Sequence, residues 1–145
     1  MKWITKTFDQ LSLHELYSIL QLRARVFIVE QECPYQDLDD KDQQAWHLYG
    51  EENGKMLAYA RLLPQNVNYP EPSIGRVIVD PSLRGRNIGK ELMNRSIAKC
   101  EELFKTKKIT LSAQCYLIKF YNELGFKEEG EEYEEDFIPH VKMKK

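Results

Sequence analysis

The chain has 145 residues, of which 42% are hydrophobic and 11% aromatic, a composition typical of one globular domain with a sizeable core and unlike that of a disordered segment. Its 21 basic and 23 acidic residues leave a formal net charge of -2, which argues against nucleic acid as a partner because such binding depends on neutralising phosphates. No stretch is long and apolar enough to span a membrane, and residues 1–6 lack the apolar run of a signal peptide. Three cysteines without a paired spacing favour a reducing, cytoplasmic setting, and the dispersed histidines and cysteines predict no metal site.

The N-terminal part of the chain predicts a strand followed by a helix. Alternating side chains over residues 3–8 are typical of a strand, and Ser12 with Glu15 three residues later forms the pattern of a capping box. The helix should end before Pro34. Helical spacing predicts that one face of this helix is buried through Leu13, Leu16, Tyr17, Leu20 and Phe27.

Three strands are expected next. Residues 46–50 and 56–63 flank Asn53-Gly54, a dipeptide that favours a tight hairpin turn. Prolines then mark a loop, and the apolar residues 74–79 predict a short strand that Asp80-Pro81 ends.

The remainder predicts two helices and three strands. A helix over residues 88–104 carries its apolar side chains on one side, and residues 109–113 form a strand. A short helix over residues 116–124 is closed by Gly125, and residues 126–133 and 138–143 suggest an antiparallel pair. The whole order, β-α-β-β-β-α-β-α-β-β, predicts an α+β fold with layers of helices flanking a mixed, mostly antiparallel central sheet, in a single domain over residues 1–145.

The most informative segment lies between the strand at 74–79 and the helix that follows it. Backbone N–H groups at the start of a helix have no internal partner, and the helix dipole adds partial positive charge, so such an end binds phosphate well. Glycines allow a sharp bend and a close approach, and basic side chains add full charges. The predicted anion site comprises Arg84, Gly85, Arg86, Asn87, Ile88, Gly89 and Lys90. The alternative is a surface turn with solvated arginines.

Other ligand motifs are excluded by position. A Walker A loop would need glycine in place of Arg84 and Ser or Thr in place of Glu91, and no GxGxxG string follows the first strand. The acidic segment 37–42 is not a calcium loop, because its sixth position is Asp42 and its twelfth is Leu48.

The turn at Arg84-Gly85-Arg86-Asn87-Ile88-Gly89 resembles the Q/R-x-x-G-x-G/A signature with which the GNAT (GCN5-related N-acetyltransferase) family binds the pyrophosphate of coenzyme A. Asn87 stands where the family usually has glycine. Asparagine tolerates a left-handed backbone better than any residue except glycine, so the turn is expected to survive this departure.

The resemblance extends over most of the chain. Residues 120–126, FYNELGF, look like the FYxxLGF segment of the family, and the order of elements resembles its whole fold. The chain is more narrowly similar to the ElaA-like subgroup, in which glycine usually occupies the place of Phe137. The matching strings are residues 22–31, residues 135–140, and Tyr35 with Asp37, Asp39, Asp42 and His47.

The resemblance implies acetyl-CoA as the acetyl donor and assigns roles to two segments. Backbone N–H groups around Val77, Ile78 and Val79 would serve the oxyanion and the pantetheine arm, and Tyr121 would protonate the departing thiolate. Taken from the residues alone, Tyr121 is expected to be a core aromatic that packs beneath Phe126 rather than a proton donor.

The general base stays open between three residues and a chain of waters that ends at one of them. Glu30 follows an apolar helix end, where partial burial would favour a base. His47 alternates with its apolar strand neighbours, and His140 follows Ile138-Pro139 near an acidic run. Histidine exchanges protons near neutral pH, although a lone histidine is more often structural.

The function predicted from these features is transfer of an acetyl group from acetyl-CoA to a primary amine, directly in a ternary complex. The acidic segments 37–42 and 128–136 would attract a cationic acceptor, or they are simply solvated faces. One alternative is a non-catalytic acetyl-CoA sensor or interaction module. Another is acylhomoserine-lactone synthesis, since residues 23–31 loosely resemble the start of those synthases. The expected partners are acetyl-CoA and a small-molecule or protein amine, with no nucleic acid or membrane, in a monomer or homodimer.

Overall fold

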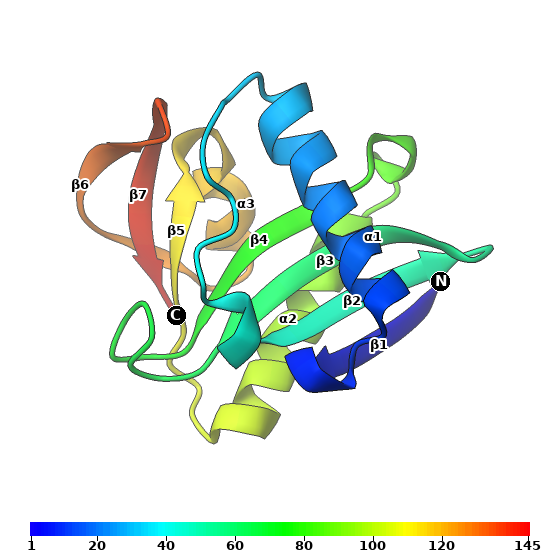
Figure 1. Ribbon diagram of the computed structural model, residues 1–145. Coiled ribbons are helices and arrows are strands. Elements are labelled where there is room, and N and C mark those ends of the chain that lie inside the picture. The colour runs from blue at the N-terminus through cyan, green and yellow to red at the C-terminus, as the bar shows by residue number, and fades with distance from the viewer.

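One seven-stranded sheet forms the centre of the protein, with strand order β1-β2-β3-β4-β5-β7-β6. The computed structural model describes all residues, Met1–Lys145 (Figure 1). Every neighbouring pair of strands is antiparallel except β4 and β5. The strands are β1 (Lys2–Thr7), β2 (Trp46–Glu52), β3 (Lys55–Leu63), β4 (Ser73–Val79), β5 (Thr110–Gln114), β6 (Lys127–Glu135) and β7 (Ile138–Lys144).

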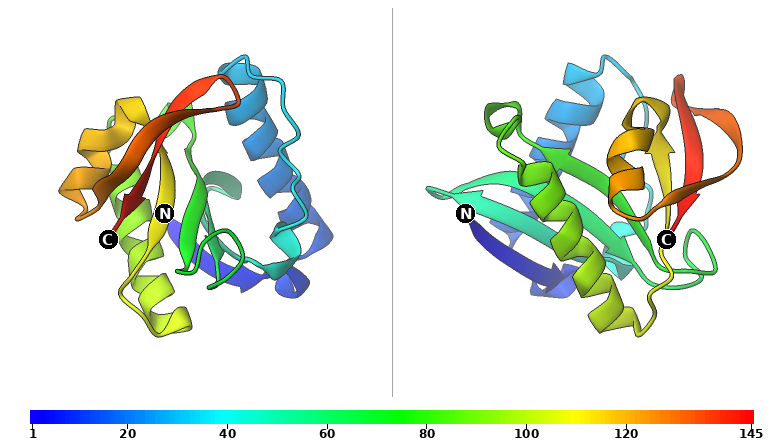
Figure 2. Two further views of the ribbon diagram at one scale, coloured as in Figure 1. Left: turned by 90° about the vertical axis from the view of Figure 1, so that its left-hand side faces the viewer. Right: turned by 180° about the vertical axis from the view of Figure 1, so that it is seen from behind.

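Helices cover both faces of the sheet. Figure 2 shows α1 on one face and α2 with α3 on the other. The helices are α1 (Leu13–Arg23), its continuation as the π-helical segment η2 (Ala24–Glu30), α2 (Ile88–Phe104) and α3 (Ile118–Glu123). Short 3-10 segments are η1 (Phe8–Gln10), η3 (Asp42–Gln44), η4 (Pro81–Leu83) and η5 (Cys115–Leu117). The predicted element order and the mixed, mostly antiparallel α+β architecture are confirmed.

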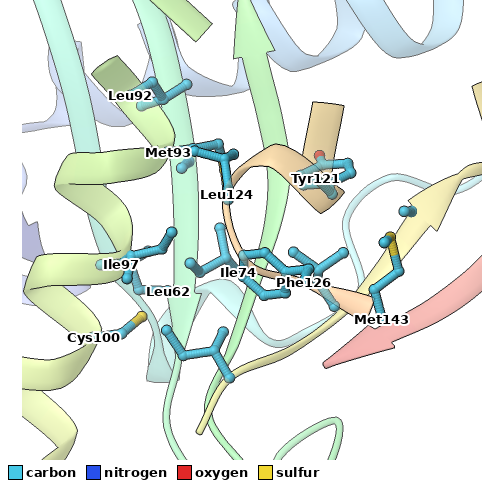
Figure 3. Packing of buried hydrophobic residues seen from close by; sticks show 14 of the residues in the cluster. Leu62, Ile74, Leu92, Met93, Ile97, Cys100, Tyr121, Leu124, Phe126 and Met143 are labelled. Carbon is cyan, nitrogen blue, oxygen red and sulfur yellow. The ribbon is translucent and has the colours of Figure 1, made fainter. Parts of the chain in front are cut away.

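The larger core lies between α2 and the sheet. Leu92, Met93 and Ile97 of α2 are buried against Leu62 and neighbouring strand residues (Figure 3). The predicted apolar side of this helix is therefore confirmed. Because α2 is anchored along its length, its N-terminus is held firmly beside the end of β4.

The smaller core lies under α1, and here the predicted helix face was only partly right, since Phe27 packs against this core but Leu13 and Tyr17 do not. Leu13 is 85% exposed and Tyr17 is 71% exposed, whereas Ile19, Leu22 and Val26 contact the sheet. Apolar residues occur on several sides of this helix, so their spacing did not select the buried side. The Ser12–Glu15 capping box at its start is confirmed.

The helix also changes geometry after Arg23. Backbone bonds such as Gln31 N to Val26 O (3.3 Å) and Cys33 N to Ile28 O (3.1 Å) span five residues, the pattern of a π-helix. Such segments occur often at functional sites. This one places Glu30 beside the turn that precedes α2.

Two turns follow the predicted chemistry. Asn53 (φ 54°) and Gly54 (φ 76°) both have positive φ in the β2–β3 hairpin, as a type I′ turn requires. Gly125, at φ 95°, follows α3 as its C-terminal cap.

The sheet opens between β4 and β5. These parallel strands pair only at Ser73 and Thr110, and they diverge beyond that point (Figure 1). β4 also contains a bulge, because Arg76 and Val77 together stand opposite Ala60 of β3. The open wedge leaves part of the β4 backbone without a partner strand.

Candidate active site

The turn between β4 and α2 adopts the conformation that an anion site needs. Gly85 has φ 88°, and Asn87 has φ 59° with ψ 20°, which is the left-handed region. The expectation that asparagine takes the place of glycine in this backbone is confirmed. Helix α2 begins directly afterwards, at Ile88, so its first N–H groups are presented at the turn.

The three basic side chains at this turn differ in their partners. Arg84 Nη1 lies 2.5 Å from Glu30 Oε1, so part of its charge is neutralised by η2. Arg86 Nη1 lies 3.7 Å from Glu52 Oε2, and Arg86 does not line the cavity described below. Lys90 forms no ion pair and lines that cavity. It is therefore the free cation of the turn.

A cavity of about 1300 Å³ occupies the wedge between β4 and β5. It runs from the turn before α2 to the loops that follow β3 and η2. Its lining includes most of the predicted coenzyme site: Val77, Ile78, Val79, Arg84, Gly85, Asn87, Ile88, Gly89 and Lys90. The fold thus joins the anion turn to a long internal space.

The β4 backbone presents N–H groups to this cavity. Asp80 N donates to Leu57 O of β3 at 2.8 Å. Backbone N–H groups alternate in direction along a strand, so the N–H group of Ile78 also points toward β3. The N–H groups of Val77 and Val79 then point toward the open side. The divergence of β5 leaves those two N–H groups for a ligand.

Tyr121 packs in the core and keeps its hydroxyl accessible. Its ring is 6% exposed and meets Phe126 edge to face, with centroids 6.1 Å apart (Figure 3). Its hydroxyl makes no hydrogen bond within the protein, and the one fully buried side-chain polar atom without a partner is Nε of Arg61. The Tyr121 hydroxyl therefore reaches the cavity that the residue lines. Burial raises the pKa of Tyr121 to about 12, so the phenol is protonated at neutral pH.

The candidate bases occupy three different places. Glu30 lines the cavity at its anion-turn end, paired with Arg84. His140 lines the cavity on β7 and is 8% exposed. His47 does not line it: this residue is fully buried, with Nδ1 2.6 Å from Tyr59 Oη and Nε2 2.9 Å from the carbonyl oxygen of Asp42. Burial lowers the pKa of His47, and both of its ring nitrogens have partners, so the structure does not bring it together with the other two candidates.

Three of the four aspartates in the acidic segment 37–42 are paired with arginines inside the protein. Arg23, which is fully buried, binds Asp37 at 2.8 Å and Asp42 at 2.7 Å. Arg61 binds Asp42 at 3.0 Å and Asp39 at 2.8 Å. We call Arg23, Arg61, Arg76, Asp37, Asp39 and Asp42 the Arg–Asp network. Asp37, Asp39 and Asp42 each have a guanidinium partner, so these three do not attract a cation as predicted, whereas Asp40 is exposed and forms no ion pair.

Sequence reasoning missed this network and one further residue of the cavity wall. Arg23, the last residue of α1, stands between the buried Leu22 of α1 and the buried Val26 of η2, and an arginine in such a position signals a buried partner. The side chains of Leu111 and Ala113 of β5 enter the core. Because successive side chains of a strand face opposite sides, the sequence already indicated that Ser112 faces away from this core.

Comparison with known proteins agrees with this geometry. The model of the acetyltransferase (GNAT) domain matches residues 13–145. This chain belongs to the GNAT family. It is 41% identical to protein ElaA of Escherichia coli strain K12 over 145 residues, covering 99% of this chain and 95% of the relative.

Solved structures of GNAT-like proteins superpose closely on this one. The crystal structure of Escherichia coli ElaA has a TM-score of 0.93 at 41% identity, and that of an acyl-CoA N-acyltransferase from Pseudomonas aeruginosa has 0.93 at 40%, each covering 99% of both chains. An aminoglycoside 6'-N-acetyltransferase complexed with coenzyme A has a TM-score of 0.69 at 16% identity, with coverage of 98% and 96%. That likeness shows the fold alone.

This GNAT protein was also searched for membrane-spanning helices and for groups of metal-binding side chains. No helix combines the length and the apolar character that crossing a bilayer requires. No group of three or more His, Cys, Asp or Glu side chains is arranged to hold a metal ion.

Proposed function

We propose that this protein transfers an acetyl group from acetyl-CoA to a primary amine, directly in a ternary complex. The observation that carries the proposal is the wedge between β4 and β5, which opens beside a left-handed turn at the start of α2. The P. aeruginosa relative is described as an acyl-CoA N-acyltransferase, and the distant aminoglycoside acetyltransferase was crystallised with coenzyme A. Both names support a coenzyme A thioester as the donor.

The donor fits the cavity in two parts. The pyrophosphate would bind the N–H groups at Gly85 to Gly89, with Lys90 supplying an unpaired positive charge. The pantetheine arm and the thioester would follow β4, where the N–H groups of Val77 and Val79 face the open side. One of these donors would hold the thioester oxygen as its negative charge grows.

The chain supplies a proton donor for the second half of the reaction. The amine lone pair forms the new C–N bond as the C–S bond breaks, and the departing sulfur takes a proton from the Tyr121 hydroxyl. A phenol with its pKa near 12 holds this proton until negative charge develops on the sulfur.

The amine must first lose its own proton. A lysine-like amine is neutral in roughly one molecule per thousand at pH 7, a deficit of about 4–5 kcal/mol. A base in the cavity offsets this deficit, and Glu30 and His140 are the candidates that line it. A non-catalytic sensor would need neither a free phenol nor a base in this space, and we do not favour it.

The test is release of coenzyme A thiol with acetyl-CoA and a broad panel of primary amines. We expect turnover that requires both substrates. Tyr121→Phe should keep its affinity for acetyl-CoA and lose about a hundredfold in kcat, the usual contribution of a general acid. Binding of acetyl-CoA without turnover on any amine would instead support the sensor, and an unchanged kcat in Tyr121→Phe would remove this residue from the mechanism.

A further inference from the structure

A polar patch covers one face of the sheet where β5, β7 and β6 lie side by side. Leu111 and Ala113 of β5 enter the core, so Ser112 takes the opposite face. Gln114 of β5 pairs with His140 of β7, which pairs in turn with Tyr133 of β6, and cross-strand partners share a face. We call Ser112, Tyr133, Glu135 and His140 the polar patch. Of these, Ser112, Glu135 and His140 line the cavity.

The carboxylate of Glu135 is the centre of this patch. Ser112 Oγ donates to Glu135 Oε2 at 3.0 Å and lies 2.5 Å from Tyr133 Oη. The same carboxylate oxygen is 3.5 Å from Nε2 of His140. No lysine or arginine forms an ion pair with Glu135, and its side chain is 50% exposed. Its carboxylate therefore has no lysine or arginine partner and keeps accessible surface at the cavity wall.

The hydrogen bond of His140 fixes which ring nitrogen is free. Nδ1 lies 2.7 Å from the carbonyl oxygen of Ile138, and a carbonyl only accepts, so Nδ1 carries the hydrogen. The lone pair of the neutral ring is consequently on Nε2, the nitrogen that faces Glu135. The ring is held by stacking on Tyr133, with centroids 6.2 Å apart. A proton taken up at Nε2 would face a carboxylate.

Two of the other carboxylates that line this space are committed to arginines, while Glu123 and Asp136 line it without an ion pair. Glu30 is bound to Arg84, and Asp39 is bound to Arg61 and Arg76. The lining also contains a cation, Lys41, whose Nζ contacts Asn68 Oδ1 at 2.5 Å. Glu135 nevertheless combines a carboxylate free of lysine and arginine, a neighbouring hydroxyl and a neighbouring imidazole.

We infer that the acceptor is a protonated primary amine whose ammonium group binds between Glu135, Ser112 and His140. This inference rests on the proposed acetyl transfer. Glu135 Oε2 and Ser112 Oγ accept hydrogen bonds from the ammonium, and His140 Nε2 removes one of its protons. The neutral amine then attacks the thioester carbon, and the second proton that the nitrogen loses replaces the one given by Tyr121 to the thiolate. His140 returns its proton to solvent, so one proton is released in each turnover.

The strand itself offers a matched control. Glu134 neighbours Glu135 on β6, and it does not line the cavity, because alternate residues of a strand face opposite sides. Glu134→Gln and Glu135→Gln remove the same charge from the same exposed strand. A fold that tolerates one change should tolerate the other.

The experiment is steady-state kinetics with spermidine, cadaverine and a lysine-containing peptide as acceptors, together with acetyl-CoA binding by calorimetry. We expect Glu135→Gln to raise the KM for the amine at least tenfold with the KM for acetyl-CoA unchanged, and His140→Gln to lower kcat about a hundredfold. Glu134→Gln should match the wild type in every parameter.

The possible failures separate the two claims. If these amines react but Glu135→Gln behaves like Glu134→Gln, the acceptor site is wrong while acetyl transfer stands. If the protein binds acetyl-CoA and acetylates uncharged nucleophiles but none of these amines, the acceptor class is wrong. If acetyl-CoA does not bind at all, the proposed function itself fails.

Discussion

Asp37 Oδ1 lies 2.7 Å from Nε of Arg76, and Oδ2 of the same carboxylate lies 2.8 Å from Nε of Arg23. One side chain therefore joins the β4 bulge to helix α1. Arg76 has φ 51°, an unfavourable backbone for an arginine, and its guanidinium also donates to the carbonyl oxygen of Asp37 at 3.1 Å. The Arg–Asp network thus holds the strand from which Val77 and Val79 face the cavity.

Asp37→Asn should destabilise the protein strongly. The change leaves the fully buried Arg23 with Asp42 as its remaining carboxylate, and breaking a buried ion pair costs about 3–5 kcal/mol. Because other members of the network remain, we expect a loss near the lower end of that range, measured by urea unfolding. Asp40→Asn is the control, since Asp40 is exposed and asparagine also tolerates its φ of 63°. Equal stability of the two variants would show that the network contributes little.

Gly89→Ala should separate stability from coenzyme binding. A Cβ at this position would meet Phe120 at 3.7 Å and Val79 at 3.8 Å, which are ordinary contacts, and alanine favours a helix by about 1 kcal/mol over glycine. The variant should therefore melt at the wild-type temperature or above it. If the site requires a bare backbone here, its affinity for acetyl-CoA should fall about tenfold. An unchanged affinity would mean that Gly89 is not needed for a close approach.

The N-terminal cap of α1 should contribute to stability in a pH-dependent way. Burial alone would raise the pKa of Glu15, but hydrogen bonds from Lys6, Ser12 and Tyr49 lower it from 4.5 to about 2. Since the folded pKa lies below the unfolded one, this stabilisation is complete above about pH 4.5 and is lost as the pH falls toward 2. Glu15→Gln should melt lower than the wild type at pH 7, with a difference that shrinks below pH 4.5. A difference that stays constant down to pH 3 would contradict this assignment.

Phe137→Gly should stabilise the β6–β7 hairpin. Phe137 has φ 66° and is 83% exposed. Its left-handed backbone therefore costs conformational free energy, and its side chain buries little surface to offset that cost. Relief of that strain is worth about 1 kcal/mol, or a few degrees in Tm. Asp136→Gly is the comparison, because aspartate already tolerates its φ of 51°. A lower Tm for Phe137→Gly would indicate that this phenylalanine packs against something its exposure does not reveal.

The local features of this fold were largely readable from the sequence. The Asn53-Gly54 turn, the Ser12 cap and the apolar side of α2 each depend on residues within a few positions of one another. The left-handed Asn87 belongs to the same class, because backbone tolerance is a property of the residue itself.

The features that were missed depend on distant parts of the chain. From the sequence, the aspartates of segment 37–42 were interpreted as a solvated or cation-binding run. Their partners Arg23, Arg61 and Arg76 lie on three other elements, so only the folded chain brings them together. The side chain of His47 could act as a base, but in the fold its two ring nitrogens contact Tyr59 Oη and the carbonyl oxygen of Asp42. The centre of the polar patch, Glu135, lay within an acidic run whose members only the sheet register distinguishes.

The most direct test of the account is thermal melting with acetyl-CoA for three proteins: the wild type, Lys90→Glu and Lys107→Glu. Lys90 is exposed and unpaired at the start of α2, so its reversal breaks no ion pair, and Lys107 carries the same change in the loop after that helix. Ligand at a hundred times its dissociation constant should stabilise the wild type by about 2.7 kcal/mol, or several degrees. We predict that Lys107→Glu keeps this shift and Lys90→Glu loses most of it. No shift in the wild type, or an equal shift in Lys90→Glu, would contradict a coenzyme site in the wedge between β4 and β5.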